Sequence, residues 1–379
     1  MSKTIDDNWR TYITTLPHQS LPYSKKNWGN PIHSLCSYQG KLKPAIASHL
    51  VKIFVPDGGT VFDPFSGVGT IPFEAALNGR HSFGMDISPL AFTVSEAKVK
   101  RHSAELCDAY INNLASYIST NLLSDDYIES NQTFGFNKQL KDYYHEDTFK
   151  EILSARQFVS EHFPSNQDEA LVVASLLHIL HGNRPYALSR RSHPIVPYAP
   201  TGDYEYKNLI VKLREKVNRA LAVETPSCFI DGSVFLRDST QEWPDDINNL
   251  DAIITSPPFF DSTRFYLANW IRLWFMGWNT EEFKTEPEKY IDERQKVDFS
   301  IYESIFAQAR ERLKDGGYFV MHLGKSKKCD MGEVLKHICG RWFPEAKLYN
   351  ESVVECEKFG IKDIGTVTSH QYLIMEKRG

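Results

Sequence analysis

A short segment in the second half of the chain places two hydrogen-bond acceptors beside a flat ring. This segment is Ser256-Pro-Pro-Phe259, and it follows an apolar stretch that is typical of a strand, Leu250 to Thr255. Proline donates no backbone hydrogen bond and has a fixed φ, so the strand must stop and the turn is rigid. The Ser256 hydroxyl and the Pro257 carbonyl could accept both protons of an exocyclic amine, while Phe259 stacks on the base that carries it. These bonds would make the amine nucleophilic and stabilise its developing positive charge, which suits transfer of a methyl group to it.

A glycine-spaced turn in the first quarter of the chain could bind a cofactor. Thr60 to Asp63 is typical of a buried strand, the turn Pro64-Phe-Ser-Gly-Val-Gly69 follows, and an apolar helix begins near Ile71. Gly67 and Gly69 can adopt positive φ and have no Cβ, so a ligand can approach the backbone closely. In an open α/β sheet, cofactors lie at such strand–turn–helix crossings, near the free N–H groups of the helix.

An acidic residue ends the next predicted strand. This strand is Ser82 to Asp86, and Asp86 follows Asp63 by 23 residues. A carboxylate at this position could accept hydrogen bonds from two ribose hydroxyls, as in dinucleotide-binding folds. Alternatively, it could cap the helix that begins near Ser88-Pro89. The strand, the spacing and the position together favour the ribose.

Alternating strands and helices position these segments, and a long helical region interrupts the alternation. Strands are predicted at 60–63, 82–86, 233–236, 250–255, 318–323, 346–354 and 366–375, and helices at 45–54, 71–77, 91–117, 168–181, 204–222, 265–278, 301–313 and 332–339. Tyr266, Trp270, Trp274 and Trp278 are four apart, which is typical of a helix face buried in the core. Residues 1–30 are polar and punctuated by proline, which predicts an N-terminal arm outside the core.

A long loop between two predicted helices is rich in cations and aromatic rings. It runs from 182 to 202 and contains four prolines, three arginines and two tyrosines. Long loops without secondary structure are often functional. The cationic side chains could contact phosphates and the tyrosines could stack on bases, although a solvated connector would have the same composition. The candidate nucleic-acid contacts are Arg184, Tyr186, Arg190, Arg191 and His193.

Together, the two turns resemble the motifs of the S-adenosylmethionine-dependent amino-methyltransferases of DNA. Asp63-Pro-Phe-Ser-Gly-Val-Gly-Thr70 is similar to the cofactor loop of that family, and Thr255-Ser-Pro-Pro-Phe259 to its catalytic turn. The Ser-Pro-Pro-Phe form resembles the cytosine-N4 branch, whereas the adenine-N6 branch carries Asp or Asn in place of Ser. The segments 37–44 and 264–278 are also similar to the family's sequences next to these motifs. The resemblance covers about residues 30–100 and 230–379.

The resemblance implies an α/β fold of the Rossmann-like class I methyltransferase type, with a seven-stranded, mostly parallel sheet. The catalytic domain would comprise residues 31–104 and 230–379, and residues 105–229 would form an inserted, mostly helical target-recognition region. S-adenosylmethionine would be the cofactor and double-stranded DNA the partner. The expected cofactor-binding residues are Tyr38, Lys41, Asp63, Phe65, Gly67, Gly69, Thr70, Asp86, Ile87, Asp238 and Ser239. The expected catalytic residues are Ser256, Pro257, Pro258 and Phe259.

The implied reaction is direct attack by the N4 amine of a cytosine that has been flipped out of the duplex. Asp261 could take the released proton or serve as a structural cap, and Lys41 and Lys43 could touch a phosphate or the cofactor carboxylate. The alternatives are adenine N6 in DNA, a base amine in RNA, glutamine methylation in a protein, and a catalytically silent nucleic-acid-binding protein. The chain contains no Pro-Cys dipeptide, which argues against methylation of carbon 5.

Composition limits the class of protein further. A chain of 379 residues with 41% hydrophobic and 24% charged residues is typical of a soluble globular protein. Its net charge of −5 gives no global attraction to nucleic acid, so DNA binding would need a local basic face. The six cysteines are scattered, which predicts reduced thiols, no metal site and a cytoplasmic location. No signal region or membrane-length apolar run is found. A companion restriction enzyme and a monomeric or homodimeric state are compatible with the sequence.

Overall fold

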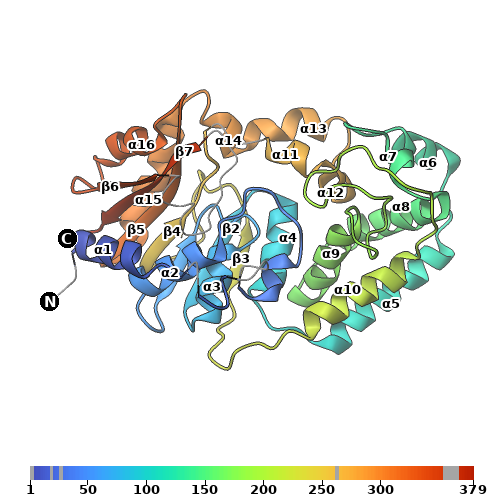
Figure 1. Cartoon of the computed structure of the whole chain (residues 1–379), viewed down its shortest axis with the longest axis horizontal. Coiled ribbons are helices and arrows are strands. Elements are labelled where there is room, and N and C mark those ends of the chain that lie inside the picture. Colours follow the sequence, from blue (N-terminus) through green and yellow to red (C-terminus); the bar gives the residue numbers. More distant parts are fainter. Residues whose placement is uncertain (1–3, 18–19, 25–28, 261–263, 353–366) are drawn as a thin grey trace.

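The computed structural model describes residues 4–17, 20–24, 29–260, 264–352 and 367–379. Its centre is a seven-stranded sheet with the order β3-β2-β1-β4-β5-β7-β6 (Figure 1). The strands are β1 (Thr60–Asp63), β2 (His81–Asp86), β3 (Ser233–Leu236), β4 (Leu250–Thr255), β5 (Leu313–Ser326), β6 (Lys347–Ser352) and β7 (Val367–Glu376). β1 to β5 pair in parallel, and β7 runs antiparallel to β5 and β6. This confirms the predicted α/β fold with a mostly parallel sheet.

The strand order changes direction between β1 and β4, at the middle of the sheet. From β1 the chain adds β2 and β3 on one side, and it later returns to place β4 on the other side. Val61 then pairs with Ala252, and Phe62 with Ile253. In open α/β sheets, the carboxyl ends of strands at such a position form the ligand-binding crevice. The two turns singled out in the sequence therefore leave the sheet side by side.

Helices cover both faces of the sheet, because successive strand residues point to opposite sides. Val61 and Ile254 belong to an apolar cluster with α2 (Pro44–Phe54) and α3 (Thr70–Leu77). Phe62 belongs to a second cluster with α15 (Glu303–Arg312) and α16 (Met331–Cys339). Both clusters consist of buried apolar side chains, so the strand ends that carry the turns are held firmly.

The N-terminal segment contributes to the core, which corrects the expectation of an outlying arm. Helix α1 (Ile5–Thr15) begins after Thr4, whose hydroxyl accepts a hydrogen bond from the Asp7 N–H in a capping box. Ile5 and Tyr12 are buried, and the Tyr12 and Tyr372 hydroxyls hydrogen bond at 2.8 Å. The polar residues of the segment lie on the solvent-facing side of an amphipathic helix. The prolines that follow the helix made this pattern hard to recognise in the sequence.

A mostly helical region lies beside the sheet (Figure 1). Its helices are α5 (Ala104–Thr120), α6 (Asp125–Gln132), α7 (Leu140–Tyr143), α8 (Glu146–Glu161), α9 (Gln167–Ile179) and α10 (Leu209–Leu221). The predicted single helix at 91–117 is in fact two, α4 (Pro89–Lys98) and α5. The break arises because Ser103 caps α5, its hydroxyl accepting a hydrogen bond from the Leu106 N–H at 3.3 Å.

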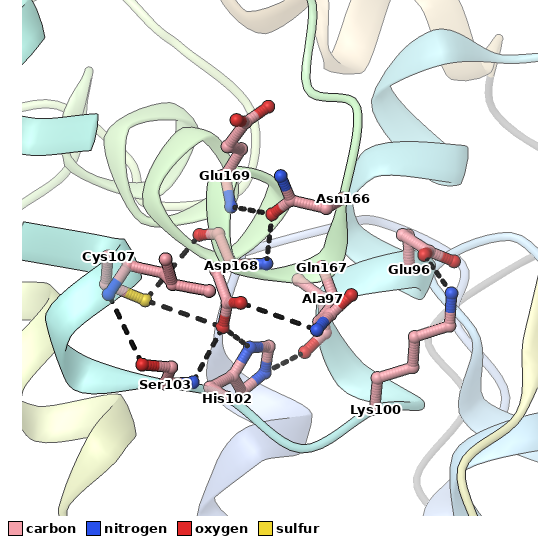
Figure 2. Close-up of polar contacts among 11 residues, drawn as sticks. Glu96, Ala97, Lys100, His102, Ser103, Cys107, Asn166, Gln167, Asp168 and Glu169 are labelled. Atoms are coloured by element: carbon pink, nitrogen blue, oxygen red, sulfur yellow. Dashed lines mark hydrogen bonds and ion pairs between the residues drawn. The ribbon is translucent and has the colours of Figure 1, made fainter. Parts of the chain in front are cut away.

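One buried carboxylate joins this break to the start of α9 (Figure 2). Asp168 Oδ1 accepts a hydrogen bond from the Ser103 N–H at 2.8 Å and lies 3.4 Å from His102 Nδ1. His102 Nε2 lies 2.7 Å from the Ala97 carbonyl at the end of α4. Burial lowers the pKa of His102, so its ring is neutral near pH 7 and can donate through Nε2. Asp168 therefore joins the break before α5 to the start of α9, and the His102 ring joins the same break to the end of α4.

The helical region and the sheet domain also share apolar packing. Leu90 and Val94 of α4 lie in the same buried cluster as Leu171 of α9 and Leu213 of α10. This cluster contains Val68 of the glycine-spaced turn as well. The helical region therefore rests directly on the elements that carry the turn.

A third connection comes from the segment after β4. It contains α11 (Phe265–Ala268), α12 (Trp270–Phe275), α13 (Glu282–Thr285) and α14 (Ile291–Arg294). Short 3₁₀ turns lie between α13 and α14, at Glu286–Lys289, and after α14, at Phe299–Tyr302. Another precedes α2, at Pro31–Ser34. Trp270, Trp274 and Trp278 are buried, as their spacing predicted. The buried Arg272 guanidinium donates to the Leu177 carbonyl at 3.2 Å and the Pro194 carbonyl at 3.1 Å. No helix in the described part of the chain is both long and apolar enough to span a membrane.

Candidate active site

A cavity of about 690 Å³ opens at the carboxyl ends of β1 and β4. Both turns contribute to its wall. The lining includes the expected residues Tyr38, Lys41, Asp63, Phe65, Gly67, Thr70, Asp86, Ile87, Asp238, Ser239, Ser256, Pro257, Pro258 and Phe259. Residues separated by almost two hundred positions in the sequence thus surround a single space, although their individual roles remain predictions.

The two strand ends are hydrogen bonded to each other. The Thr255 hydroxyl at the end of β4 donates to Asp63 Oδ1 at the end of β1, at 2.6 Å. The same carboxylate oxygen accepts from the Phe65 N–H at 3.1 Å, which closes the first turn after β1. Burial raises the pKa of Asp63 to about 7, against the lowering effect of these two hydrogen bonds. Asp63 therefore fixes the relative position of the two halves of the cavity.

Asp86 holds the glycine-spaced turn from the neighbouring strand. Its two oxygens accept from the Gly67 N–H and the Ser88 N–H, each at 2.9 Å. The cap of α4 is Ser88, whose hydroxyl accepts from the Ala91 N–H at 3.4 Å, so Asp86 is not the N-cap. Burial raises the pKa of Asp86 to about 6. A carboxylate has about four acceptor positions, so Asp86 keeps capacity for ligand hydroxyls in the cavity.

The two glycines of the turn serve different purposes. Both have positive φ, 49° at Gly67 and 69° at Gly69. A Cβ on Gly67 would point toward the Tyr38 ring at 3.9 Å, across the cavity wall. A Cβ on Gly69 would lie 2.3 Å from Ser95 Oγ of α4, and Gly69 does not line the cavity. Gly69 therefore permits close packing of α3 on α4, and the structure gives no support for the direct cofactor contact expected of it.

The segment before α2 forms another wall. The Tyr38 ring lies 4.7 Å from the Phe265 ring, centroid to centroid. The Lys41 ammonium donates to the His33 carbonyl at 2.7 Å, and burial lowers its pKa. Lys43 also lines the cavity. Lys41 thus already has an acceptor within the protein, which reduces its capacity to bind a phosphate.

Asp238 and Ser239 follow β3 and complete the cofactor side. Asp238 Oδ1 accepts from the Thr240 N–H at 2.9 Å, and Oδ2 pairs with Arg294 Nη1 at 3.0 Å. The Ser239 hydroxyl donates to the Pro64 carbonyl of the glycine-spaced turn. Asp238 is held from two sides while its carboxylate faces the cavity.

The Ser-Pro-Pro-Phe turn is supported by residues for which the sequence suggested no role. Gln295, fully buried, donates to the Pro258 carbonyl at 2.9 Å and is itself held by the Tyr302 hydroxyl at 2.9 Å. The Ser256 hydroxyl lies 3.0 Å from His322 Nδ1 of β5. A Cβ on Gly324 would lie 2.5 Å from Phe259 Cδ2, so this glycine makes room for the ring.

These supporting residues could not be inferred because nothing in their local patterns marks them. His322 falls inside a strand that was predicted on its apolar residues, and Gln295 follows a short helix in a stretch without clear periodicity. Within the described residues, no donor binds the Pro257 carbonyl, so it can accept from a ligand. Asp261, the candidate proton acceptor, lies outside the described residues.

The loop at 182–202 is more ordered internally than a solvated connector. Arg190 donates through Nε to the Gly202 carbonyl at 2.7 Å and through Nη1 to the Asp142 carbonyl at 2.9 Å, and its guanidinium lies 4.2 Å from the Tyr204 ring centroid. Two of its three guanidinium nitrogens are thus engaged in the fold, which reduces its capacity for a phosphate, and its nucleic-acid contact stays a prediction. His193 Nδ1 similarly accepts from the Ile195 N–H at 3.3 Å.

Other residues of the loop remain accessible to a partner. Arg184 and Arg191 are exposed, and their side chains form no hydrogen bond or ion pair within the described part of the chain. The Tyr186 hydroxyl lies 3.1 Å from His178 Nε2, and His178 Nδ1 accepts from the Ser37 N–H at 3.2 Å. This chain of contacts connects the loop to Ser37, the neighbour of Tyr38 in the cavity wall.

The cavity has the features that a cationic, ribose-containing cofactor requires. Its lining holds acids and lysines, so it offers acceptors for hydroxyl and ammonium groups and cations for a carboxylate: Asp63, Asp86, Asp238, Asp292, Lys41, Lys43 and Lys289. The Ser66 hydroxyl, also in the lining, is buried without a hydrogen-bond partner among the described residues. These observations fit S-adenosylmethionine, whose sulfonium and ammonium groups are cationic. No group of three or more potential metal ligands occurs in the described portion.

Comparison with known proteins finds a similarity to DNA methyltransferases. Residues 2–97 match the model of the N6/N4 DNA methylase family. The type II methyltransferase M.MjaII of Methanocaldococcus jannaschii is 27% identical over 109 residues, which are 28% of this chain and 21% of that protein. The first quarter of the chain is thus similar to the N4/N6 DNA methyltransferases. S-adenosylmethionine is the cofactor of these methyltransferases, and it carries an ammonium, a carboxylate and ribose hydroxyls that the mixed lining of acids and lysines fits.

Solved structures show a weaker likeness to this chain. A TehB-like S-adenosylmethionine-dependent methyltransferase from Corynebacterium glutamicum is 11% identical, with a TM-score of 0.33 and coverage of 88% of this chain and 87% of that one. An rRNA methylase from Streptococcus thermophilus is 11% identical, with a TM-score of 0.33 and coverage of 89% and 98%. TM-scores this low carry no conclusion about activity. Since the matched segment spans about a fifth of M.MjaII, the substrate of this chain has to be argued from its own cavity.

Proposed function

We propose that this chain transfers a methyl group from S-adenosylmethionine to the exocyclic N4 amine of a cytosine in double-stranded DNA. The observation that carries the proposal is the position of Ser256-Pro-Pro-Phe259 in the same cavity as the glycine-spaced turn. A serine, rather than an acid or amide, leads this turn, as in the cytosine-N4 branch that it resembles. The base would leave the duplex to reach the cavity, at a cost of a few kcal/mol.

The cofactor side would be formed by the turn after β1 and by two acids. When bound, S-adenosylmethionine supplies an electrophilic methyl group on a cationic sulfur. Asp86 would accept from its ribose hydroxyls, Ile87 would flank the adenine, and Asp238 would accept from the adenine amine. Asp63 and Phe65 would line the methionine half. Gly67 lacks a Cβ, which lets a ligand approach the backbone.

The catalytic side would hold the target amine by its two protons. Ser256 Oγ and the Pro257 carbonyl would accept them, and Phe259 would stack on the base. The geometry supports this assignment, because Gln295 occupies the Pro258 carbonyl and leaves the Pro257 carbonyl open. Preorganised acceptors stabilise the positive charge that develops on nitrogen without reorganisation during the reaction.

The helical region would contact the DNA around the flipped base. Residues 105–229 would read the target sequence, and the exposed Arg184 and Arg191 would bind phosphates in the 182–202 loop. Tyr186 lies two contacts from Ser37 and thus near the cavity wall. Binding energy from these residues would position the base and the methyl donor in line.

Transfer of labelled methyl to mixed-sequence DNA, followed by mass spectrometry of the nucleosides, tests the proposal. N4-methylcytosine is the expected product. N6-methyladenine, or label in RNA alone, would overturn the choice of substrate. A protein that fails to bind S-adenosylmethionine in calorimetry would instead be a silent nucleic-acid-binding scaffold. Ser20→Ala, at an exposed position of the N-terminal segment, is a matched control for substitution of Ser256.

A further inference from the structure

Two buried histidines stand in line behind the catalytic serine. Ser256 Oγ lies 3.0 Å from His322 Nδ1, and His322 Nε2 lies 3.1 Å from His370 Nδ1. The two rings are nearly parallel, with an interplanar angle of 15° and centroids 5.1 Å apart. Both side chains line the cavity, although each residue is less than a tenth exposed. A continuous row of titratable groups therefore leads from the catalytic turn into β5 and β7.

This row is not needed to hold the turn. Gln295 already fixes the Pro258 carbonyl, and Thr255 already joins β4 to Asp63. Burying two imidazoles inside a sheet carries a desolvation cost that an apolar pair would avoid. The Phe259 ring also lies close to His322, at 5.5 Å between centroids. A chemical task at the catalytic turn accounts for polar groups in this position.

The proposed reaction leaves one proton to remove. When the amine nitrogen attacks, a nitrogen–carbon bond forms, the carbon–sulfur bond breaks, and the nitrogen carries a surplus proton. A serine hydroxyl is too weak a base to keep that proton. A neutral imidazole bonded to the hydroxyl can take it, because the hydroxyl can receive one proton while it gives up another.

We propose that His322 is the final acceptor of the proton released by the target amine, with Ser256 as the carrier and His370 as a positioning residue. The inference rests on the proposed function. The amine proton passes to Ser256 Oγ as the hydroxyl proton passes to His322 Nδ1. His322 Nε2–H donates to His370 Nδ1, which selects the tautomer with a free lone pair on Nδ1 and stabilises the imidazolium that forms.

The surroundings keep His322 neutral before the reaction. Burial lowers its pKa well below the usual value, and the nearby His370 and Lys43 act in the same direction. Tyr372 of β7 packs on the ring at 5.1 Å between centroids, and Tyr12 of α1 hydrogen bonds the Tyr372 hydroxyl. A weak base is sufficient here, because a methylated amine that is still conjugated to the ring is a strong acid.

A kinetic experiment separates proton removal from simple support. In His322→Asn, the amide oxygen can still accept from Ser256 but cannot take a proton. We expect the single-turnover rate of methyl transfer to DNA to fall by about 10² to 10⁴, with the affinities for S-adenosylmethionine and DNA unchanged. The wild-type rate should decline at acidic pH as His322 becomes protonated, and the variant should lack this dependence. His337→Asn, on the exposed side of α16, is the matched control. A rate near the wild-type value would overturn the role of His322.

A second measurement needs neither DNA nor the His322→Asn variant. Histidine-selective ¹⁵N NMR of the wild-type protein reports which nitrogen of His322 carries the proton. We expect a protonated Nε2 and a free Nδ1 at pH 7, with the Nδ1 signal shifted in Ser256→Ala. A proton on Nδ1 would contradict the proposal, because that nitrogen could not then accept one from Ser256.

The two proposals fail in different ways. If the label appears on adenine N6 and His322→Asn slows its transfer, the cytosine assignment falls and the proton role stands. If the label appears on cytosine N4 and His322→Asn transfers it at an unchanged rate, the cytosine assignment stands and the proton role of His322 falls. If the wild-type protein labels no nucleic acid, the proposed function falls, and the role of His322 falls with it whatever its tautomer.

Discussion

At the scale of single residues, several acceptors in the cavity wall use part of their hydrogen-bonding capacity within the protein and keep the rest for a ligand. Asp86 accepts from two backbone N–H groups and still faces the cavity. The Pro257 carbonyl is open while its neighbour at Pro258 is occupied. This arrangement favours binding, because a group that the protein already holds in place loses little conformational entropy when a ligand binds.

Substitution of the catalytic turn should separate chemistry from cofactor binding. Ser256→Ala removes one of two acceptors for the amine, and we expect methyl transfer to slow by about 10² to 10³. The affinity for S-adenosylmethionine should hardly change, because we assign Ser256 to the side of the cavity that binds the base. Rapid-quench kinetics and calorimetry measure the two quantities. Full turnover by Ser256→Ala would show that the hydroxyl is not an acceptor, and Ser20→Ala controls for the substitution itself.

Stacking by Phe259 should appear in a different parameter. Phe259→Ala removes a ring whose stacking on a base contributes about 1–3 kcal/mol. We therefore expect weaker binding of the flipped base, seen as a higher KM for DNA, with cofactor affinity preserved. A fluorescent base analogue at the target position would report flipping directly. An unchanged KM and an unchanged fluorescence signal would assign Phe259 to the core rather than to the base.

Cofactor affinity should depend on pH through Asp86. Because burial raises the pKa of this group to about 6, its carboxylate is present above pH 6 and becomes protonated below it. Ribose hydroxyls donate to the charged form, so affinity should be constant above pH 7 and fall by up to about tenfold per pH unit below pH 6. Calorimetry at several pH values measures this.

The contribution of Asp86 can be isolated, although Asp63 titrates nearby. Asp86→Asn keeps one acceptor oxygen for the backbone and removes the titration, so its affinity should be lower and the acid limb shallower. Asp246→Asn changes an exposed carboxylate and should behave as wild type. An identical acid limb in wild type and Asp86→Asn would assign the pH dependence to another group, such as Asp63.

At the scale of elements, the sequence predicted the strands and turns well where a strong local pattern coincided with the final structure. The apolar strands that end in Asp63 and Thr255 and the buried tryptophan stripe were all evident from residue types. The packing role of Gly69 was not, because it depends on Ser95 of a helix that lies across the turn. His322 and Gln295 were missed for the same reason, since their importance arises from contacts across the sheet.

The arginine-rich loop illustrates how similar side chains receive different tasks. Arg190 is committed to two carbonyls and a tyrosine ring, whereas Arg184 and Arg191 are exposed. We expect Arg184→Ala with Arg191→Ala to weaken DNA binding and reduce the salt slope of log K by about 2. Filter binding between low and moderate salt measures the slope.

Two controls make this test specific. Arg10→Ala removes an exposed arginine from α1, on the opposite end of the molecule in Figure 1, and should leave the slope unaltered. Arg190→Ala should instead lower the melting temperature, because it removes bonds within the fold. A wild-type slope in the Arg184/Arg191 double variant would exclude this loop as the phosphate contact.

At the scale of the whole molecule, the helical region is fastened to the sheet domain by a few buried polar groups in addition to apolar packing. The Asp168 carboxylate in Figure 2 is one of them, and it accepts from the Ser103 N–H at the break between α4 and α5. Asp168→Ala would leave the Ser103 N–H without its acceptor, and we expect a loss of about 1–3 kcal/mol in the free energy of unfolding. Urea denaturation measures this loss, and Glu105→Gln on the exposed first turn of α5 should be nearly neutral. Equal stability of the two variants would contradict the role of Asp168 as a joint.

The sequence could not reveal this arrangement of the whole molecule. The boundary predicted at residue 104 coincides with the start of α5, yet the apolar cluster ignores that boundary and continues through Leu90, Leu171 and Leu213. The N-terminal helix was likewise assigned to solvent because its buried residues are few. Packing partners far apart in the chain leave no mark in local composition.

The shared apolar cluster has a consequence for how the target specificity of such a protein can change. Removing residues 105–229 would uncover Leu90 and Val94 of α4, next to the turn that faces the cavity. Residues 105–229 therefore cannot be exchanged between related chains on their own, because the apolar face of α4 would have to be replaced with them. We expect new specificities in this lineage to arise by substitutions in surface loops, and recombination across residue 104 to yield mostly misfolded hybrids.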